Sequence, residues 1–172
     1  VNGPSGEDQV VIGNSAPTAP VVDVTPNSPL TTDDLVCSIT TESTDADGDT
    51  VTYTYAWYKG DVLQPALITD TVPSADTAKG ESWKCVVTPS DGSVNGPSGE
   101  DQVVIGNSAP TAPVVDVTPN SPLTTDDLVC AITTPSTDAD GDTVTYTYEW
   151  YKDDVLQPAL ITDTVDSSNT SK

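Results

Sequence analysis

The stretch Thr50-Val-Thr-Tyr-Thr-Tyr-Ala-Trp-Tyr-Lys59 alternates small polar and large apolar side chains along most of its length. Because neighbouring side chains of a β-strand point to opposite faces, this alternation predicts a strand whose inner face ends at Trp57. The same rule predicts a strand on either side of it in the chain. Their inner faces carry Cys37 in one case and Trp83 with Cys85 in the other, so two cysteines and a tryptophan are expected to point into one core with Trp57.

This arrangement resembles the immunoglobulin-like sandwich, in which a buried Trp packs against a disulfide between two sheets and an aromatic residue precedes the second Cys by two positions. The resemblance implies a disulfide between Cys37 and Cys85, with Trp57 packed against it. Trp83 stands at the aromatic position, where the family usually has Tyr. Two free, buried thiols are the alternative to the disulfide.

The chain contains an internal repeat, which is the strongest single feature of the sequence. Residues 1–79 align with residues 94–172 without a gap, at a period of 93 residues. The two copies differ at eight aligned positions, none of which lies on the predicted inner faces. Such similar neighbours indicate a tandem array, and we expect the chain to be part of a longer one.

Two proline-containing segments, 14–20 and 107–113, have the composition of linkers and define the phase of the repeat. We therefore predict that residues 1–14 are the last strand of a preceding repeat, that 15–107 form a complete repeat, and that 108–172 form an incomplete following one. In this phase Cys130 matches Cys37 and is left unpaired, while Trp150 matches the core residue Trp57.

Within the complete repeat, turn residues separate seven short strands. The predicted strands cover residues 21–25, 35–40, 51–59, 62–64, 66–72, 81–88 and 100–105. The predicted fold class is all-β, with tandem immunoglobulin-like β-sandwiches of about seven strands.

The chain is strongly acidic, with 27 Asp and Glu against five Lys and Arg and a formal charge of −22. A surface of this charge repels phosphates, so nucleic acid and anionic lipid are not expected partners. The sequence contains no apolar run of the length that a membrane helix needs, so no membrane insertion is expected in this segment. Together with the implied disulfide, these features predict an extracellular or cell-surface location.

An acidic loop precedes the tyrosine-rich strand in each copy. Its carboxylates are Asp45, Asp47 and Asp49 in the first copy and Asp138, Asp140 and Asp142 in the second. Alternating carboxylates with a glycine suit a calcium ion, but the same residues also form ordinary solvated turns. The string resembles the Asp-x-Asp-Gly-Asp segment of bacterial cadherin-like and polycystic-kidney-disease-like surface repeats. Further candidate ligands are Asp33, Asp34, Glu42 and Asp91.

Three classes of function follow from these features. The first is a spacer in an extracellular fibre or adhesin stalk, whose partners are the neighbouring repeats of its own chain. The second is a self-associating filament subunit completed by strand donation between chains, and the third is a module that binds carbohydrate or protein. A glycan acceptor pattern at residues 169–171 adds glycans to the candidate partners. No catalytic role is expected, because the chain has no His and no zinc-binding or phosphate-binding motif.

Overall fold

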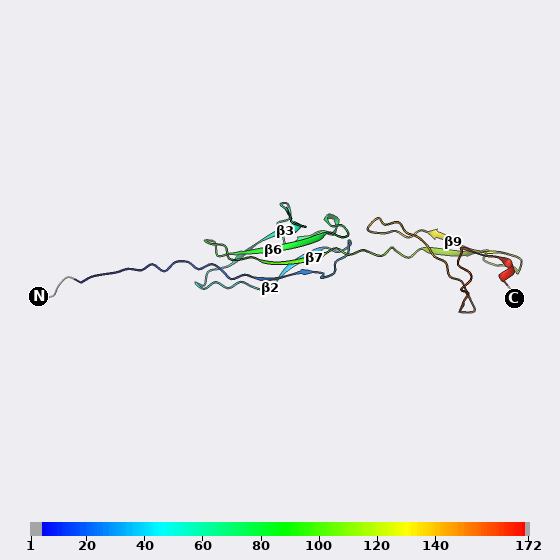
Figure 1. Cartoon of the computed structure of the whole chain (residues 1–172), viewed down its shortest axis with the longest axis horizontal. Helices are drawn as coiled ribbons and strands as arrows, with labels where there is room; N and C mark the ends of the chain where they lie inside the picture. The colour runs from blue at the N-terminus through cyan, green and yellow to red at the C-terminus, as the bar shows by residue number, and fades with distance from the viewer. Residues whose placement is uncertain (1–4, 171–172) are drawn as a thin grey trace. The chain divides into compact units, whose positions relative to one another are not determined.

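The computed structural model describes residues 5–170 and divides the chain into two compact units, Val1–Asn107 and Ser108–Lys172 (Figure 1). Residues 1–4, which belong to the strand predicted over 1–14, lie outside the described residues, as do residues 171–172. Among the described residues, each unit is built from antiparallel β-strands and one short 3-10 turn, so the predicted all-β class is confirmed. Among the described residues there is no helix with the length and apolar character needed to cross a membrane.

The first unit contains two sheets within its described residues (Figure 1). One has the order β1-β2-β5 and consists of β1 (Val21–Thr25), β2 (Leu35–Thr41) and β5 (Thr71–Val72). The other has the order β4-β3-β6-β7 and consists of β3 (Thr52–Lys59), β4 (Val62–Gln64), β6 (Ser82–Ser90) and β7 (Gly99–Val104). All neighbouring strands in both sheets are antiparallel.

The two sheets share one core, and a disulfide crosses it. Cys37 of β2 is bonded to Cys85 of β6, which is the predicted pairing. Trp57 of β3 lies directly opposite Cys85 in the β3–β6 ladder and is completely buried. Its indole N–H donates a hydrogen bond to the backbone oxygen of Thr69 at 2.9 Å, so the buried polar atom of this large side chain is satisfied. Trp83 is also buried, and its indole N–H donates to a carboxylate oxygen of Glu81 at 3.0 Å.

Within the predicted complete repeat, 15–107, the predicted strands agree with the structure to within two residues at their ends, except in one region. The strand predicted over residues 66–72 is wrong in extent, since only Thr71–Val72 form β5. The residues before it make a turn that is closed by a hydrogen bond from the Leu67 N–H to the Gln64 carbonyl at 3.1 Å. Pro65, inside this turn, has no N–H to contribute to a ladder, which favours the turn over a continuous strand.

The segment 14–20 is not a free linker in the first unit, which corrects the interpretation drawn from its composition. Pro17 and Pro20 are buried. They are covered by the chain that leads into β7, where Gly96 and Gly99 approach them closely. A Cβ atom on Gly96 would lie 2.1 Å from the Pro17 carbonyl oxygen, and one on Gly99 would lie 2.2 Å from that of Pro20. Glycine is therefore required at both positions.

Residues 5–12 repeat the sequence of residues 98–105, which include β7, in a different environment. In β7 and just after it, Val103 is 6% exposed and Ile105 is 1% exposed. The matching Val10 and Ile12 are 80% and 83% exposed, and no strand is assigned to residues 5–20. The difference follows from the neighbours, because β7 pairs along its length with β6.

The second unit keeps part of the same framework. Its main sheet has the order β12-β9-β8 and consists of β8 (Val114–Thr118), β9 (Leu128–Thr134) and β12 (Thr164–Val165). A hairpin of β10 (Tyr151–Lys152) and β11 (Val155–Leu156) lies apart from it in the pairing pattern. Residues 145–150, which match most of β3, are not assigned to a strand, and no described strand corresponds to β6.

Gly99 and the matching Gly6 have the same position in the repeat but different surroundings, so they allow this packing to be tested. We expect Gly99→Ala to lower the free energy of unfolding of the first unit by about 1–3 kcal/mol, because the new methyl group overlaps the Pro20 carbonyl. The matched control is Gly6→Ala, since nothing lies within 4 Å of a Cβ atom at Gly6. Chemical denaturation followed by tryptophan fluorescence measures both. Equal effects of the two substitutions would contradict this account of the packing.

Candidate functional site

The acidic loop of the first unit is organised by one carboxylate. An oxygen of Asp45, Oδ1, accepts hydrogen bonds from the backbone N–H groups of Asp47 at 2.8 Å and Asp49 at 3.2 Å. Gly48, between them, has a positive φ of 80°. These are the contacts of a turn in which an Asp side chain bonds to the following backbone and glycine supplies the left-handed conformation.

The loop also holds the segment that precedes β1, a contact that the sequence analysis missed. Oδ2 of Asp47 accepts a hydrogen bond from the Ser15 N–H at 2.6 Å. Thr18 adds a pair of bonds to Thr44, in which its N–H donates to the Thr44 carbonyl at 2.9 Å and its hydroxyl oxygen accepts from the Thr44 N–H at 2.8 Å. The acidic loop therefore fastens the entering chain to its own unit.

The second unit repeats these contacts. Asp138 accepts from the N–H groups of Asp140 at 2.9 Å and Asp142 at 3.1 Å. Oδ2 of Asp140 accepts from the Ser108 N–H at 2.7 Å, and Thr111 is bonded to Thr137 in the same way as Thr18 is to Thr44. The agreement between two copies indicates that the anchor is a property of the repeat.

The loops also contain features that suit a cation. In the second unit, one carboxylate oxygen from each of Asp138, Asp140 and Asp142 lies within 4.8 Å of the others. In the first, Oδ2 of Asp45 is buried and has no hydrogen-bond partner among the described residues. A buried carboxylate oxygen without a donor is unfavourable unless a cation or water satisfies it. Calcium takes six to eight oxygens, so waters would have to complete its shell at either loop.

The further candidate ligands are engaged in other contacts. Asp33 caps a turn by accepting from the Leu30 N–H at 2.9 Å. Asp34 accepts from the Ser74 N–H at 2.7 Å, and that hydrogen bond lowers the pKa of its carboxyl group. Glu42 is exposed. Asp33 and Asp34 are therefore each bound to a turn outside the acidic loop.

Asp91 lies at the same end of the entering segment as the acidic loop. It accepts hydrogen bonds from the N–H groups of Val94 and Ser93, each at 2.7 Å, and from the side-chain amide of Asn14 at 2.8 Å. The bond from Val94, followed by those from Asn14 and Ser93, lowers the pKa of this carboxyl group. Asn14 and the adjacent Ser15 are thus bound to two different acidic side chains, Asp91 and Asp47.

The remaining predicted site residues divide between the two units. Cys37, Cys85, Trp57 and Trp83 lie together in the core of the first unit. In the second unit, Cys130 is a free, half-buried cysteine, and Trp150 is half-buried where Trp57 is fully buried. The predicted pairing of Cys37 with Cys85 is confirmed, whereas Trp150, predicted as a core residue, is only half-buried.

No protein-family model matches this sequence, and no curated protein matches it either. Its function is therefore inferred from the residues and contacts of the chain itself.

The link between Asn14 and Asp91 can be tested by titration. We expect carboxyl NMR to give Asp91 a pKa below the ordinary aspartate value, and Asn14→Ala to raise it part of the way back, because one of its donors is lost. A lowered folded-state pKa stabilises the fold above the unfolded pKa of about 3.9, and that stabilisation is lost as the pH falls through the folded value. Ser98→Ala is a control that leaves the Asp91 contacts intact. An Asp91 pKa that does not respond to Asn14→Ala would contradict the contact.

Proposed function

We propose that this chain is a structural segment of an extracellular or cell-surface fibre, in which immunoglobulin-like repeats act as disulfide-tied spacers. The role is structural rather than catalytic. The observation that carries the proposal is the reuse of one anchoring scheme in both copies, which fastens each entering segment to its own repeat.

Three features of the first unit support the immunoglobulin-like assignment. Its strands β1-β2-β5 match the A, B and E strands of that fold, and β3-β6-β7 match the C, F and G strands. The remaining strand, β4, pairs with β3, on the sheet to which the variable type of the fold adds its extra strands, and not with β5. The disulfide joins the second strand to the sixth, and the buried tryptophan is on the third. The family places its disulfide and its tryptophan on the same strands.

The short connection between the repeats supports a spacer. The last backbone hydrogen bonds of the first unit include Gly106 N–H to the Pro29 carbonyl, at 2.7 Å. In the second unit, the Ser108 N–H donates a hydrogen bond to the Asp140 carboxylate. A single residue, Asn107, lies between these two anchored residues. A long flexible linker permits free reorientation, whereas one residue permits little.

Composition supports the proposed location. The high density of negative charge keeps an exposed array soluble, because the chains repel one another and do not associate non-specifically. A disulfide across the core persists in an oxidising environment, which the cell exterior provides. Near-identical copies suit a spacer, because its length matters and its individual surfaces do not.

Lengthening the connection tests the spacer proposal. We expect insertion of Gly-Ser-Gly-Ser after Asn107 to broaden the distribution of distances between spin labels placed in the two units, because it separates the anchors at Gly106 and Ser108. The same insertion after Asn14, in an identical local sequence, is the control and leaves that distribution unchanged. If the chain without an insertion already gives a distance distribution as broad as that of the lengthened chain, the short connection does not restrict the repeats and the spacer proposal is contradicted.

We further propose that the acidic loops bind calcium and so stiffen the array. The close carboxylates of Asp138, Asp140 and Asp142 and the unsatisfied oxygen of Asp45 support this role. Bound calcium would neutralise charge beside Asp47 and Asp140, the residues that hold Ser15 and Ser108. The loop would then combine its role as a turn with that of a metal-dependent anchor.

Thermal unfolding in millimolar calcium and in chelator tests the metal proposal. A ligand that binds only the folded state stabilises it by roughly 2.7 kcal/mol at 100 times its dissociation constant. We expect a higher midpoint with calcium but not with magnesium, and loss of the difference when Asp45, Asp47, Asp49 and their three counterparts are changed to Asn. Asp33→Asn is the control, since Asp33 caps a separate turn. Identical melts would leave the loops as turns alone.

A further inference from the structure

The four-stranded sheet of the first unit has one side that does not face the core. The residues of β6 alternate between buried and partly exposed, so every second side chain of this strand points outwards. The ladders place outward residues of neighbouring strands side by side. Tyr58 lies opposite both Leu63 of β4 and Lys84 of β6, and Lys84 lies opposite Gln102 of β7. We call the outward side chains of β3, β4, β6 and β7 the outer face.

The outer face carries one pair of opposite charges in a strongly acidic chain. Among the outward side chains of these four described strands, only Lys84 and Glu100 are charged. Lys59 and Asp101, the other charged residues of the strands, lie opposite buried residues of β6 and so belong to the inner side. The face is therefore neutral, although the chain has a formal charge of −22.

The uncharged residues of the outer face are apolar or carry hydroxyl groups. The apolar ones around the charged pair are Ala56, Tyr58, Leu63, Val86 and Val104. Of these, Leu63 is 47% exposed and Val104 is 57% exposed. Further along β3 and β6, Thr and Ser residues lie opposite one another. The centres of protein–protein interfaces have this kind of composition, because charged residues are depleted there and tyrosine is enriched.

The charged pair is arranged so that it can be shared between two copies. Lys84 Nζ lies 3.7 Å from a Glu100 oxygen, and the two side chains are 28% and 63% exposed. In a two-fold interface the same patch is used by both partners, so a contact from one residue to another occurs twice. A two-fold axis between Lys84 and Glu100 would therefore place each lysine beside the glutamate of the other copy. The pair is self-complementary.

The contacts of Tyr58 favour a protein over a carbohydrate as the occupant of the outer face. A sugar stacks on an open aromatic ring, whereas Tyr58 is only partly exposed. In addition, Lys84 Nζ lies over its ring, 5.4 Å from the centre. The ring is thus already in contact with a cation of its own sheet.

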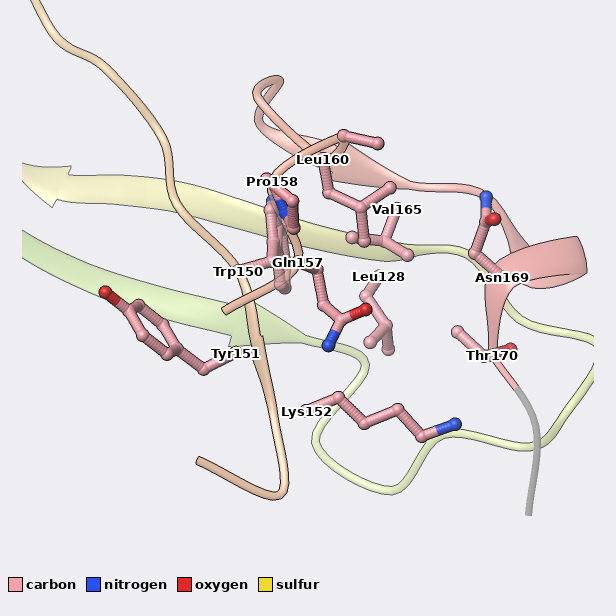
Figure 2. Close-up of a pocket in the computed structure, with 11 residues that line it drawn as sticks. Leu128, Trp150, Tyr151, Lys152, Gln157, Pro158, Leu160, Val165, Asn169 and Thr170 are labelled. Carbon is pink, nitrogen blue, oxygen red and sulfur yellow. The ribbon is translucent and has the colours of Figure 1, made fainter. Parts of the chain in front are cut away.

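The second copy of the repeat carries a variation at this face. Glu149 stands where the first copy has Ala56, and Tyr151 matches Tyr58. The Tyr151 hydroxyl donates a hydrogen bond to Glu149 Oε2 at 3.0 Å. Figure 2 shows Tyr151 pointing away from Leu128, which lines a pocket of this unit. The repeat therefore accepts a carboxylate at this position, and that carboxylate adds negative charge beside the tyrosine.

We propose that the outer face of the first unit is the surface through which two copies of this chain associate side by side, with Lys84 of each copy against Glu100 of the other. The occupant is a second copy because the charged pair is self-complementary and the face is neutral, while the acidic loops of two chains repel one another. This inference goes beyond the spacer role and does not depend on it.

Self-association of the full 172-residue chain, measured by analytical ultracentrifugation, tests the proposal. All chains carry Cys130→Ser, so that a disulfide between free cysteines does not contribute. At about 0.15 M salt, charges more than about 8 Å apart are largely screened. We expect a dimer that forms as the concentration rises. Ala56→Glu should weaken it by about tenfold or more, because a two-fold contact brings the added carboxylate into the interface twice.

Two controls separate the interface from charge and folding. Ser38→Glu adds the same charge to the outward side of β2, in the other sheet, and should leave the dimer unchanged. Ala56→Glu should keep the thermal midpoint of the unsubstituted chain, since the second copy already has Glu149 at the matching position.

Charge reversal tests the pairing itself. Lys84→Glu should weaken the dimer by about tenfold or more, and Lys84→Glu combined with Glu100→Lys should restore it, because the two charges are kept with their positions exchanged. A surface ion pair of this kind contributes little to folding. In a mixture of isotope-labelled and unlabelled chains, carbodiimide should join Lys84 to Glu100 in peptide pairs of which one member is labelled.

Three results would overturn the proposal. The first is a chain that sediments as a monomer up to millimolar concentration. The second is a dimer that Ala56→Glu and Ser38→Glu weaken equally. The third is a monomeric chain in which added cellohexaose shifts the NMR signals of β3 and β6, which would assign the face to a carbohydrate. The insertion after Asn107 does not touch the outer face, so failure of the spacer role and failure of this proposal are distinguishable.

Discussion

The structure depends on the contact of β6 with the rest of the core. This strand pairs with β3 on one side and β7 on the other, carries the cysteine bonded to β2, and contributes Trp83 to the buried core. The two units have nearly identical sequences, but only the first includes β6 among its described residues. In the first unit, Trp57 and Leu35 are fully buried. In the second, whose described residues include no strand that matches β6, the matching Trp150 and Leu128 are partly exposed and residues 145–150 are not assigned to a strand.

A second constraint acts at the start of each repeat. Asp45 and Asp138 each satisfy two backbone N–H groups of their own loop, and Asp47 and Asp140 each hold the first residue of the entering segment. A hydrogen bond from a backbone N–H to a carboxylate is stronger than one to a neutral acceptor, because one partner is charged. Under the calcium proposal, the same carboxylates would also bind the ion, and the turn and the proposed metal site are compatible uses of one loop.

These two constraints give the proposed spacer a physical basis. The disulfide limits the unfolded chain of a small unit whose core is modest, and the anchor limits the freedom of the chain between units. The anchor is present in both copies, so a longer array would have it at each step.

The sequence by itself determined the all-β class, the positions of all strands of the first unit except β5, the inner faces and the residues of the core of that unit. These follow from side-chain alternation, turn residues and the repeat period, which are local properties of the chain. Only the tertiary structure decided whether a segment with strand sequence forms a strand. Residues 98–105 run along β6 and are partly buried, while the identical residues 5–12 have no strand assigned, because a strand needs a partner that local sequence does not specify. In the same way, Pro17 and Pro20 were interpreted as linker residues, and their burial became evident only from the close approach of Gly96 and Gly99, more than 70 residues further along the chain.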